Sequence, residues 1–546
     1  MGGPTSNTYD AIVVGAGHSG LVGAFYLAKA GWRVLVLEAR DVVGGCCVTE
    51  EVIPGYRCSA VSNSSHSLDP RIIADMELTA FGLRYSHPEL ASLTLFEDGR
   101  AFVPWPDRAQ RRAQIERFAR GSDVEGFGAV LDRIRRVAQR MKVSFHEAPP
   151  TFAEVAARFT TPQEVADFNA LMFGSVADLL DEHLESPELK AFFAATAVAT
   201  NLVGPHTPGS AYLLLQRPLY EESMAAFGID DRNDLMMRNA APLGGIGSVT
   251  QAMQRSIEAR GAVVETGARV RRILADSGEA VGVELEDGRE FFAPRILSNA
   301  DPKLTLTELV HEEDLPAEFV ARARGLKMAG TSAKVHIAMK GTPRFAVATS
   351  DEENALFLPT NFRIASSIDV LQEAYNLAVM GRWSRNVTVT GLMDSAIDPS
   401  MVDESGHHIM SLSVRGVPYH LAEGTWDEQR DELGRAVLDT ITTHMPNVAD
   451  IVDAVHVYTP LDLEREYGLV EGSGSHGDIV PGRLFDSRPL AGASDYTTPL
   501  AGLYLCGVGT WPGNFMSGVT GHNASHRMLH DAAVTPTFET SEPQVW

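Results

Sequence analysis

The chain has 546 residues, of which 44% are hydrophobic and 21% charged, and its formal net charge is −25. This length predicts more than one domain, and the acidity argues against nucleic acid as a partner. No apolar run is long enough to span a bilayer and no secretory signal is visible, so we expect a cytoplasmic protein. The sequence offers no support for a peripheral membrane contact and leaves the oligomeric state open.

The first predicted elements are an apolar strand over residues 11–14, a glycine-rich turn and a helix. The turn has the pattern G-x-G-x-x-G, formed by Gly15, Ala16, Gly17, His18, Ser19 and Gly20. Such glycines allow a tight turn, a close backbone approach to a diphosphate and close packing of helix on sheet. The N–H groups at the start of the helix are then free to bind phosphate.

A second apolar strand, over residues 34–37, ends at Glu38. A carboxylate at this place accepts hydrogen bonds from an adenosine ribose, and it disfavours NADP because a 2′-phosphate would carry a like charge. Strand, glycines, helix, strand and acid in this order predict a Rossmann unit that binds a dinucleotide. The other G-x-G-x-x-G of the chain, at 472–477, has no apolar strand before it and is predicted to be a loop.

The residues after the acid distinguish between dinucleotides. Ala39 and Arg40 follow Glu38, and the pair Gly44–Gly45 follows shortly after. This resembles the extended FAD signature of the amine oxidase and phytoene desaturase flavoproteins, in which the double glycine passes close to the flavin end of the diphosphate. FAD is therefore the expected cofactor.

The cysteines show neither metal-ligand spacing nor a disulfide framework. They are Cys46, Cys47, Cys58 and Cys506. We predict no metal site and reduced thiols, although the adjacent Cys46 and Cys47 leave open a vicinal disulfide or a covalent link to the flavin.

Farther along the chain, residues 106–240 are predicted to be mostly helical, and residues 243–302 return to a helix followed by short strands with hairpin turns at 277–278 and 287–288. Alternating strands and a helix over 427–445 follow, and the chain ends with a strand, a glycine-rich loop and a last helix. We predict an α/β fold with a Rossmann-type FAD-binding domain (9–105, 241–305 and 456–535). It is interleaved with an α+β substrate domain, a mixed sheet plus a helical insertion (106–240 and 306–455).

The resemblance extends over most of the chain. The segments GGCCVTEEVIPGYRCS, GGIGSVTQAM, TGARVRRIL, LSNADP and GLYLCGVGTWPG occur in the order of the phytoene desaturase-like superfamily, closest to its branch called pyridine nucleotide-disulphide oxidoreductase domain-containing protein 2. The resemblance implies that Val270 lies against the adenine and Gly507 beside the ribityl chain. It also implies that a helix beginning near Gly518 and Val519 points its N–H groups at the flavin.

Side-chain roles are harder to assign. His476 is the best polar candidate for a base or an orienting group near the flavin. The alternative is a structural role, in which His476 fixes the conformation of its loop. Lys334 could match the lysine that holds a water at the flavin of amine oxidases, but the local pattern favours packing. Trp511 stands where relatives commonly have His and could face substrate, as could Ser62 and His66.

These features predict an FAD-dependent oxidoreductase that dehydrogenates, or desaturates, a small hydrophobic or alicyclic substrate, with oxygen or a quinone as acceptor. A redox-neutral double-bond isomerase and an amine oxidase are alternatives on the same fold. A flavin-bearing binding protein without turnover is an alternative of another class. No Cys-x-x-Cys pair or second nucleotide fold supports disulfide reductase chemistry.

Overall fold

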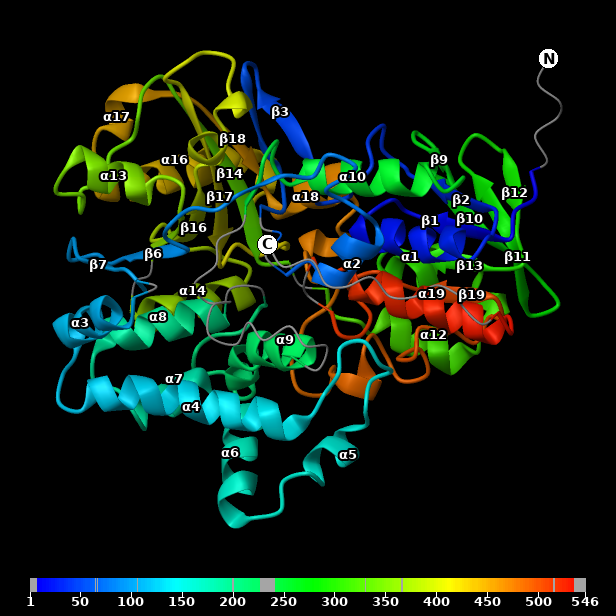
Figure 1. The fold of residues 1–546 in the computed structure, drawn as a ribbon, viewed down its shortest axis with the longest axis horizontal. Coiled ribbons are helices and arrows are strands. Elements are labelled where there is room, and N and C mark those ends of the chain that lie inside the picture. Colours follow the sequence, from blue (N-terminus) through cyan, green and yellow to red (C-terminus); the bar gives the residue numbers. More distant parts are fainter. Residues whose placement is uncertain are drawn as a thin grey trace.

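The computed structural model describes residues 7–63, 65, 67–105, 107–198, 201–225, 241–328, 330–364, 367–513 and 516–534. His66, a predicted substrate-facing residue, lies outside the described residues. Figure 1 shows the layered sheets at the right and upper left and a helical region below them. Within the described part of the chain, no helix is both long and apolar enough to cross a membrane.

A parallel five-stranded sheet forms the centre of the first region. Its order is β19 (Leu503–Leu505), β13 (Ile296–Ser298), β1 (Ala11–Val14), β2 (Val34–Leu37) and β9 (Val263–Glu265). All four pairings are parallel, so the carboxyl ends of the strands meet at one edge. Ligands of such sheets bind at this edge.

Four strands of this sheet are buried on both faces, whereas the edge strand β9 is partly exposed. Alternate side chains of the buried strands enter two different cores. Ala11 and Val13 pack toward the helices α1 (His18–Lys29), α10 (Gly247–Glu258) and α19 (Val519–Asp531). Ile12 and Val14 pack instead toward a second, antiparallel sheet. That sheet consists of β10 (Val270–Asp276), β11 (Glu279–Leu285) and β12 (Glu290–Phe292).

A seven-stranded mixed sheet forms the second region. Its order is β18 (Val452–Tyr458), β14 (Ser332–Met339), β17 (His408–Arg415), β16 (Thr388–Leu392), β15 (Asn361–Ile364), β6 (Ser92–Leu95) and β7 (Ala101–Phe102). One face carries the apolar side chains and packs against α16 (Trp426–His444) and α13 (Asp351–Phe357). The opposite face carries polar side chains and faces the protein interior.

The predicted helical insertion lies below this sheet in Figure 1. It contains α3 (Arg108–Phe118), α4 (Asp123–Met141), α5 (Phe152–Ala156), α6 (Pro162–Phe173), α7 (Val176–Asp181), α8 (Pro187–Ala197) and α9 (Gln216–Ala225). The helix α14 (Ile368–Val379), from a later part of the chain, packs on α8. Phe127 from α4 and Phe192 and Phe193 from α8 form part of the aromatic core of this layer.

The predicted fold class, a parallel Rossmann-type sheet combined with a mixed sheet and helices, is confirmed. The predicted boundary at residue 105 does not coincide with a sheet boundary, because β6 and β7 join the seven-stranded sheet through a parallel pairing of β6 with β15. Residues 306–328 were predicted to belong to the substrate domain, yet Leu306 and Phe319 pack in the core behind the five-stranded sheet. The division into domains itself stays a prediction.

The close packing of α1 against α19 can be tested by substitution. A Cβ atom added to Gly521 would overlap the Ser19 carbonyl oxygen and lie 3.0 Å from the Gly23 nitrogen. Because these are backbone atoms that cannot rotate away, we expect Gly521→Ala to lower the free energy of unfolding by about 1–3 kcal/mol. Gly128, inside α4, has nothing within 4 Å of such an atom, so Gly128→Ala should raise it by roughly 0.5–1 kcal/mol. Urea unfolding of both variants checks this, and equal responses would contradict the packing.

Candidate functional site

The turn between β1 and α1 is built for close backbone contact. Gly15 has φ +91°, in the left-handed region that favours glycine. A Cβ atom on Gly20 would overlap the Gly15 carbonyl oxygen, and one on Gly17 would lie 2.5 Å from Asn299 Nδ2. The first turn of α1 contains no acidic residue and no side chain caps it. Its N-terminal amides and dipole therefore favour an anion at this position.

Glu38 lies at the carboxyl end of β2 with only 6% of its surface exposed. Its carboxylate accepts hydrogen bonds from the Ala16 N–H (2.8 Å) and the Arg40 N–H (2.9 Å). Its carbonyl oxygen accepts the Ala268 N–H at 2.8 Å, which brings the strand beginning at Val270 beside it. The structure thus brings together the predicted ribose acid, the glycine turn and the predicted adenine contact.

The double glycine packs directly on this turn. The Gly44 N–H donates to the Ala16 carbonyl at 2.8 Å, and Gly44 and Gly45 have φ values of +124° and +58°. A Cβ atom on Gly44 would lie 2.5 Å from the Cys47 carbonyl oxygen. Two stretches of backbone without side chains therefore face each other, which is the cradle that the diphosphate of FAD requires.

Arg40 has neighbours that the sequence did not indicate. Its guanidinium pairs with Glu50 at 2.5 Å and lies 4.5 Å from the centre of the Tyr467 ring. One nitrogen, Nη1, is buried without a hydrogen-bond partner among the described residues. This nitrogen remains available to a ligand, whereas Ala39 contributes only backbone at the adjoining position.

The C-terminal segment completes the same edge. A Cβ atom on Gly507 would lie 3.0 Å from the Asn299 carbonyl oxygen. Gly518 caps α19 with φ +75°, and the first turn of this helix has no acidic residue. Thr520 near the start of α19 donates to Ser19 near the start of α1 at 2.8 Å. Two helix N-termini therefore lie side by side, and both favour negative charge.

Arg488 connects the loop at Ser475 with the loop at Val508, beside this edge. The sequence did not indicate this role. Only 2% of the residue is exposed, and its guanidinium donates to the carbonyl oxygens of Ser475 (3.0 Å), Val508 (3.0 Å) and Thr510 (3.3 Å). Burial lowers its pKa to about 10. The side chain is still charged at neutral pH, so the loops around Gly507 surround a buried positive charge.

His476, the predicted catalytic residue, lies beside Gly509: a Cβ atom on Gly509 would come within 3.0 Å of the His476 carbonyl oxygen. His476 Nδ1 is 3.5 Å from Asp301 Oδ2, and neither atom has a hydrogen-bond partner among the described residues. Burial, reinforced by Arg488, lowers the pKa of His476 to about 4. Burial raises the pKa of Asp301 to about 7. At pH 7 His476 is a neutral imidazole.

The other predicted substrate contacts have different surroundings. Trp511 is 1% exposed, and its ring packs against Phe145 and Phe485, with ring centres 5.6 Å apart in both pairs. Its indole N–H is buried without a partner among the described residues. Ser62 donates its backbone N–H to the Cys46 carbonyl at 2.9 Å, next to the double glycine. The four cysteines are free thiols.

The polar face of the seven-stranded sheet is the main feature that the sequence did not reveal. Strand pairing aligns its side chains in rows, Arg363–Thr390–Ser413–Lys334–Tyr458 and Thr388–Arg415–Ser332. The signal was present as polar residues at every second position of three strands. Such alternation usually marks a solvent-facing surface, which is why it did not indicate a buried one.

Lys334 belongs to this polar face and not to the apolar core. It is 4% exposed and donates to Ser413 Oγ at 2.9 Å. Burial and the nearby Arg415 lower its pKa to about 8, against the opposing effects of Asp394, Cys58 and Cys46. Since Cys46 directly follows the double glycine, this lysine lies on the side of the sheet that faces the dinucleotide turn.

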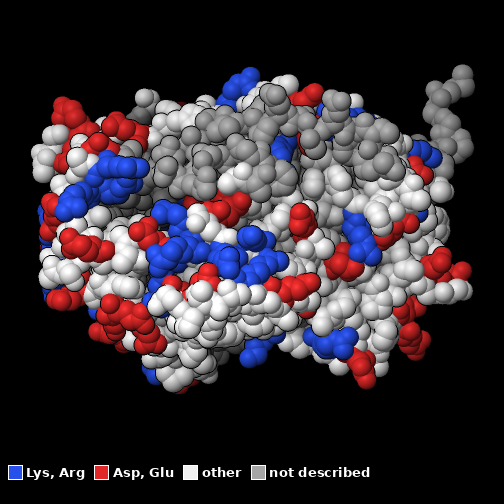
Figure 2. Space-filling model, turned by 60° about the horizontal axis from the view of Figure 1, so that its bottom comes forward, with Lys and Arg blue, Asp and Glu red and all other residues white. Residues whose placement is uncertain are grey.

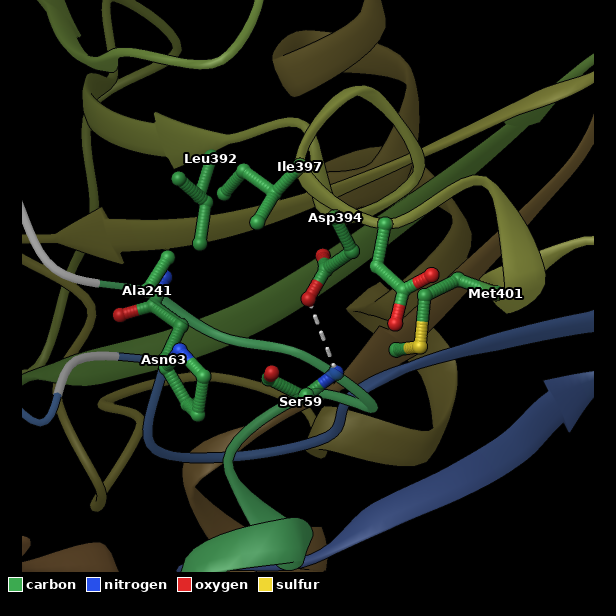
Figure 3. A pocket seen from close by; sticks show the side chains of 10 residues that line it. Ser59, Asn63, Ala241, Leu392, Asp394, Ile397 and Met401 are labelled. Atoms are coloured by element: carbon green, nitrogen blue, oxygen red, sulfur yellow. Dashed lines mark hydrogen bonds between the residues drawn. The ribbon is translucent and has the colours of Figure 1, made fainter. Parts of the chain in front are cut away.

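A small pocket opens between this sheet and the loop after β4 (Tyr56–Ser59). Figure 3 shows Asp394 pointing toward Ser59, whose backbone N–H it accepts at 3.1 Å. Asp394 also accepts the Ser411 hydroxyl at 2.5 Å, and its burial raises the pKa of the carboxyl. Both carboxylate oxygens are thus already engaged within the protein.

Comparison with known proteins agrees with this geometry. The family model described as flavin containing amine oxidoreductase matches residues 18–520. The rat pyridine nucleotide-disulfide oxidoreductase domain-containing protein 2 is 32% identical, over 96% of this chain and 94% of the relative. A subunit of the limonene dehydrogenase of Castellaniella defragrans is 27% identical, over 96% of this chain and 94% of the relative.

Among solved structures, the cyclohexylamine oxidase of Brevibacterium oxydans superimposes with a TM-score of 0.58 at 19% identity, covering 96% of this chain and 99% of that one. This likeness supports the fold. The chain belongs to the flavin containing amine oxidoreductase family and is an FAD-dependent oxidoreductase.

Proposed function

We propose that the protein dehydrogenates a hydrophobic or alicyclic substrate, with oxygen or a quinone as the final electron acceptor. A hydride leaves one carbon, a proton leaves its neighbour, and a carbon–carbon double bond forms between them. The observation that carries the proposal is the neutral imidazole of His476, whose Nδ1 has no hydrogen-bond partner among the described residues and lies beside the Gly507 loop. A buried neutral imidazole can accept the proton.

FAD, when bound, supplies the hydride acceptor. The chain supplies the surroundings: the glycine turns hold the diphosphate, and the N-termini of α1 and α19 and the charge of Arg488 favour negative charge at the flavin end. Trp511, Phe145 and Phe485 form an apolar wall that excludes water from the reacting centre. The similarity to a limonene dehydrogenase supports a dehydrogenation of this kind.

Anaerobic mixing with alicyclic and isoprenoid substrates tests this function. We expect a substrate to bleach the flavin absorbance near stoichiometrically, because net oxidation transfers two electrons to the cofactor. Turnover only after prior chemical reduction would favour a redox-neutral isomerase, and bleaching by amines alone would favour an amine oxidase. Full FAD content with no bleaching by any substrate class would favour a binding protein.

The proposed ribose contact is tested with Glu38→Gln. The amide cannot accept the same charge-assisted hydrogen bonds, so we expect the dissociation constant for FAD to rise about tenfold or more. Glu265 ends the neighbouring parallel strand β9 and pairs with Arg289. Glu265→Gln is therefore the matched control and should change the dissociation constant for FAD less than about twofold. Flavin fluorescence titration of the apoproteins measures both. Equal affinities of the two variants for FAD would show that Glu38 does not contact the cofactor.

The proposed base makes a pH prediction. Because the pKa of His476 is about 4, the imidazole is neutral above about pH 5, and protonation blocks the acceptor only as the pH falls toward 4. We expect the rate of flavin reduction in stopped-flow mixing to decrease as the pH falls below about 5, and a second change near pH 7 would report the neighbouring Asp301 carboxyl. His476→Asn should slow the step by roughly 10²–10⁴-fold at unchanged FAD content.

Lys334→Met is the control, and we expect its pH profile to match that of the parent protein. Since the pKa of Lys334 is about 8, its free amine forms as the pH rises through that value. A rate that rises through about pH 8 in the parent protein, and loses this rise in Lys334→Met, would transfer the role of base from His476 to Lys334.

A further inference from the structure

A second cavity, partly open to solvent, lies between the polar face of the seven-stranded sheet and the helical insertion. Its helical side is lined mostly by apolar residues, Val198, Leu202, Leu371 and Ala374, together with Asn201 and Tyr375. Its opposite side is polar and is formed by Thr388 and Arg415 of adjacent strands. The cavity is therefore amphipathic, with the charged group at one end.

The polar end contains hydrogen-bonding atoms that the protein leaves unused. Arg415 donates through Nη1 to Ser332 Oγ at 2.7 Å, while its Nε has no partner among the described residues. The hydroxyl oxygen of Thr388, paired directly with Arg415 across the two strands, is likewise buried without a partner there. Buried polar groups are nearly always hydrogen-bonded, so an unused donor and hydroxyl at a cavity wall point to a ligand.

A second guanidinium strengthens the positive charge of this end. Arg363, from the neighbouring strand β15, donates to the Thr196 hydroxyl at 2.6 Å and the Phe192 carbonyl at 3.5 Å. No carboxylate forms an ion pair with Arg363 or Arg415 in the part of the chain that the structure describes. Burial lowers the pKa of both groups to about 10, and for Arg415 the charge of Arg363 adds to this effect. Both residues are half-buried and remain charged at neutral pH without a carboxylate partner.

Surface arginines of the same region behave differently. Figure 2 shows Lys and Arg side chains grouped on one face of the molecule with Asp and Glu close to them. On α4, Arg135 lies 3.1 Å from Asp132, and Arg140 lies 3.3 Å from Glu164. The chain, which has an excess of acidic residues, provides carboxylates for these exposed arginines, yet it provides none for the pair beside the cavity.

We propose that this cavity binds the anionic head group of an amphipathic substrate, a carboxylate or a phosphate, with its apolar part on the helical wall. The inference rests on the proposed function and narrows its substrate class from a neutral hydrocarbon to an acid. A guanidinium with a free N–H and an adjacent hydroxyl suit the oxygens of such a group. Ser332, the partner of Arg415, is two residues from Lys334 on β14, so both side chains lie on the same face of the sheet.

Calorimetric titration of the FAD-bound protein with three probes tests the proposal. The probes are cyclohexanecarboxylate, cyclohexyl phosphate and the neutral cyclohexanecarboxamide, which matches the carboxylate in shape. We expect at least one anion to bind roughly tenfold or more tightly than the carboxamide, because only the anion forms charge-assisted hydrogen bonds. The better of the two anions identifies the head group. Equal binding of all three, or no binding, would overturn the proposal without any variant.

Variants locate the site. Arg415→Gln should weaken binding of the preferred anion roughly tenfold or more and leave the carboxamide unchanged, and Arg415→Lys should retain part of the affinity. Arg385 is 76% exposed and pairs with Glu432, so Arg385→Gln is the control and should bind like the parent. If Arg415→Gln loses FAD or unfolds, Arg363→Gln supplies the same comparison. Undiminished anion binding in both folded variants would overturn the proposal.

Different outcomes reject the proposed dehydrogenation and the proposed anion site. Flavin bleaching by neutral substrates without anion binding would reject only the acidic substrate. Anion binding without bleaching by any acid or neutral compound would reject dehydrogenation and leave the site in place.

Discussion

Close contact between stretches of backbone is the constraint on which the site depends. The turn from Gly15 to Gly20 and the double glycine approach each other closely because glycines, Gly17 on one side and Gly44 and Gly45 on the other, occupy the points of contact. Gly521 lets α19 approach α1 in the same way. This approach places two helix N-termini at one edge of the parallel sheet. A diphosphate can then be bound by N–H groups, which carry no net charge of their own, in a chain whose net charge is −25.

The part of the fold near this constraint was predictable because its determinants are local. Strand, glycines, helix, strand and acid follow one another within 30 residues, and each has a stereochemical requirement that few residue types meet. The G-x-G-x-x-G at 472–477 shows the value of context: the same letters without a preceding strand form a loop, in which Glu471 and His476 have positive φ. The pairing of β6 with β15 could not be predicted in this way, because it joins Leu93 to Phe362 across the chain.

The buried polar face of the mixed sheet could not be predicted from the sequence, for a different reason. Alternation in a strand specifies which side chains share a face, but not whether water or protein covers that face. In the sequence, Ser332, Lys334 and His336 resemble a solvent-facing row of polar residues, whereas Lys334 and His336 are buried and Ser332 is half-buried. His476 could be named as a candidate from its position before the last cofactor segment, but its neutrality depends on burial and on Arg488, which lies 12 residues away in sequence.

The distribution of charge separates the two halves of the site. At the dinucleotide turn, the backbone amides and the dipole of α1 favour negative charge, and Arg488 adds a buried positive charge in the loops around Gly507. The polar face of the mixed sheet carries full charges on Lys334, Arg363 and Arg415, which suit the anionic group of the proposed substrate. Members of one fold differ in function through such sites and not through the scaffold. An acidic substrate is therefore compatible with relatives whose names refer to a hydrocarbon or an amine, because the cradle for the cofactor and the face that meets the substrate are set by different residues.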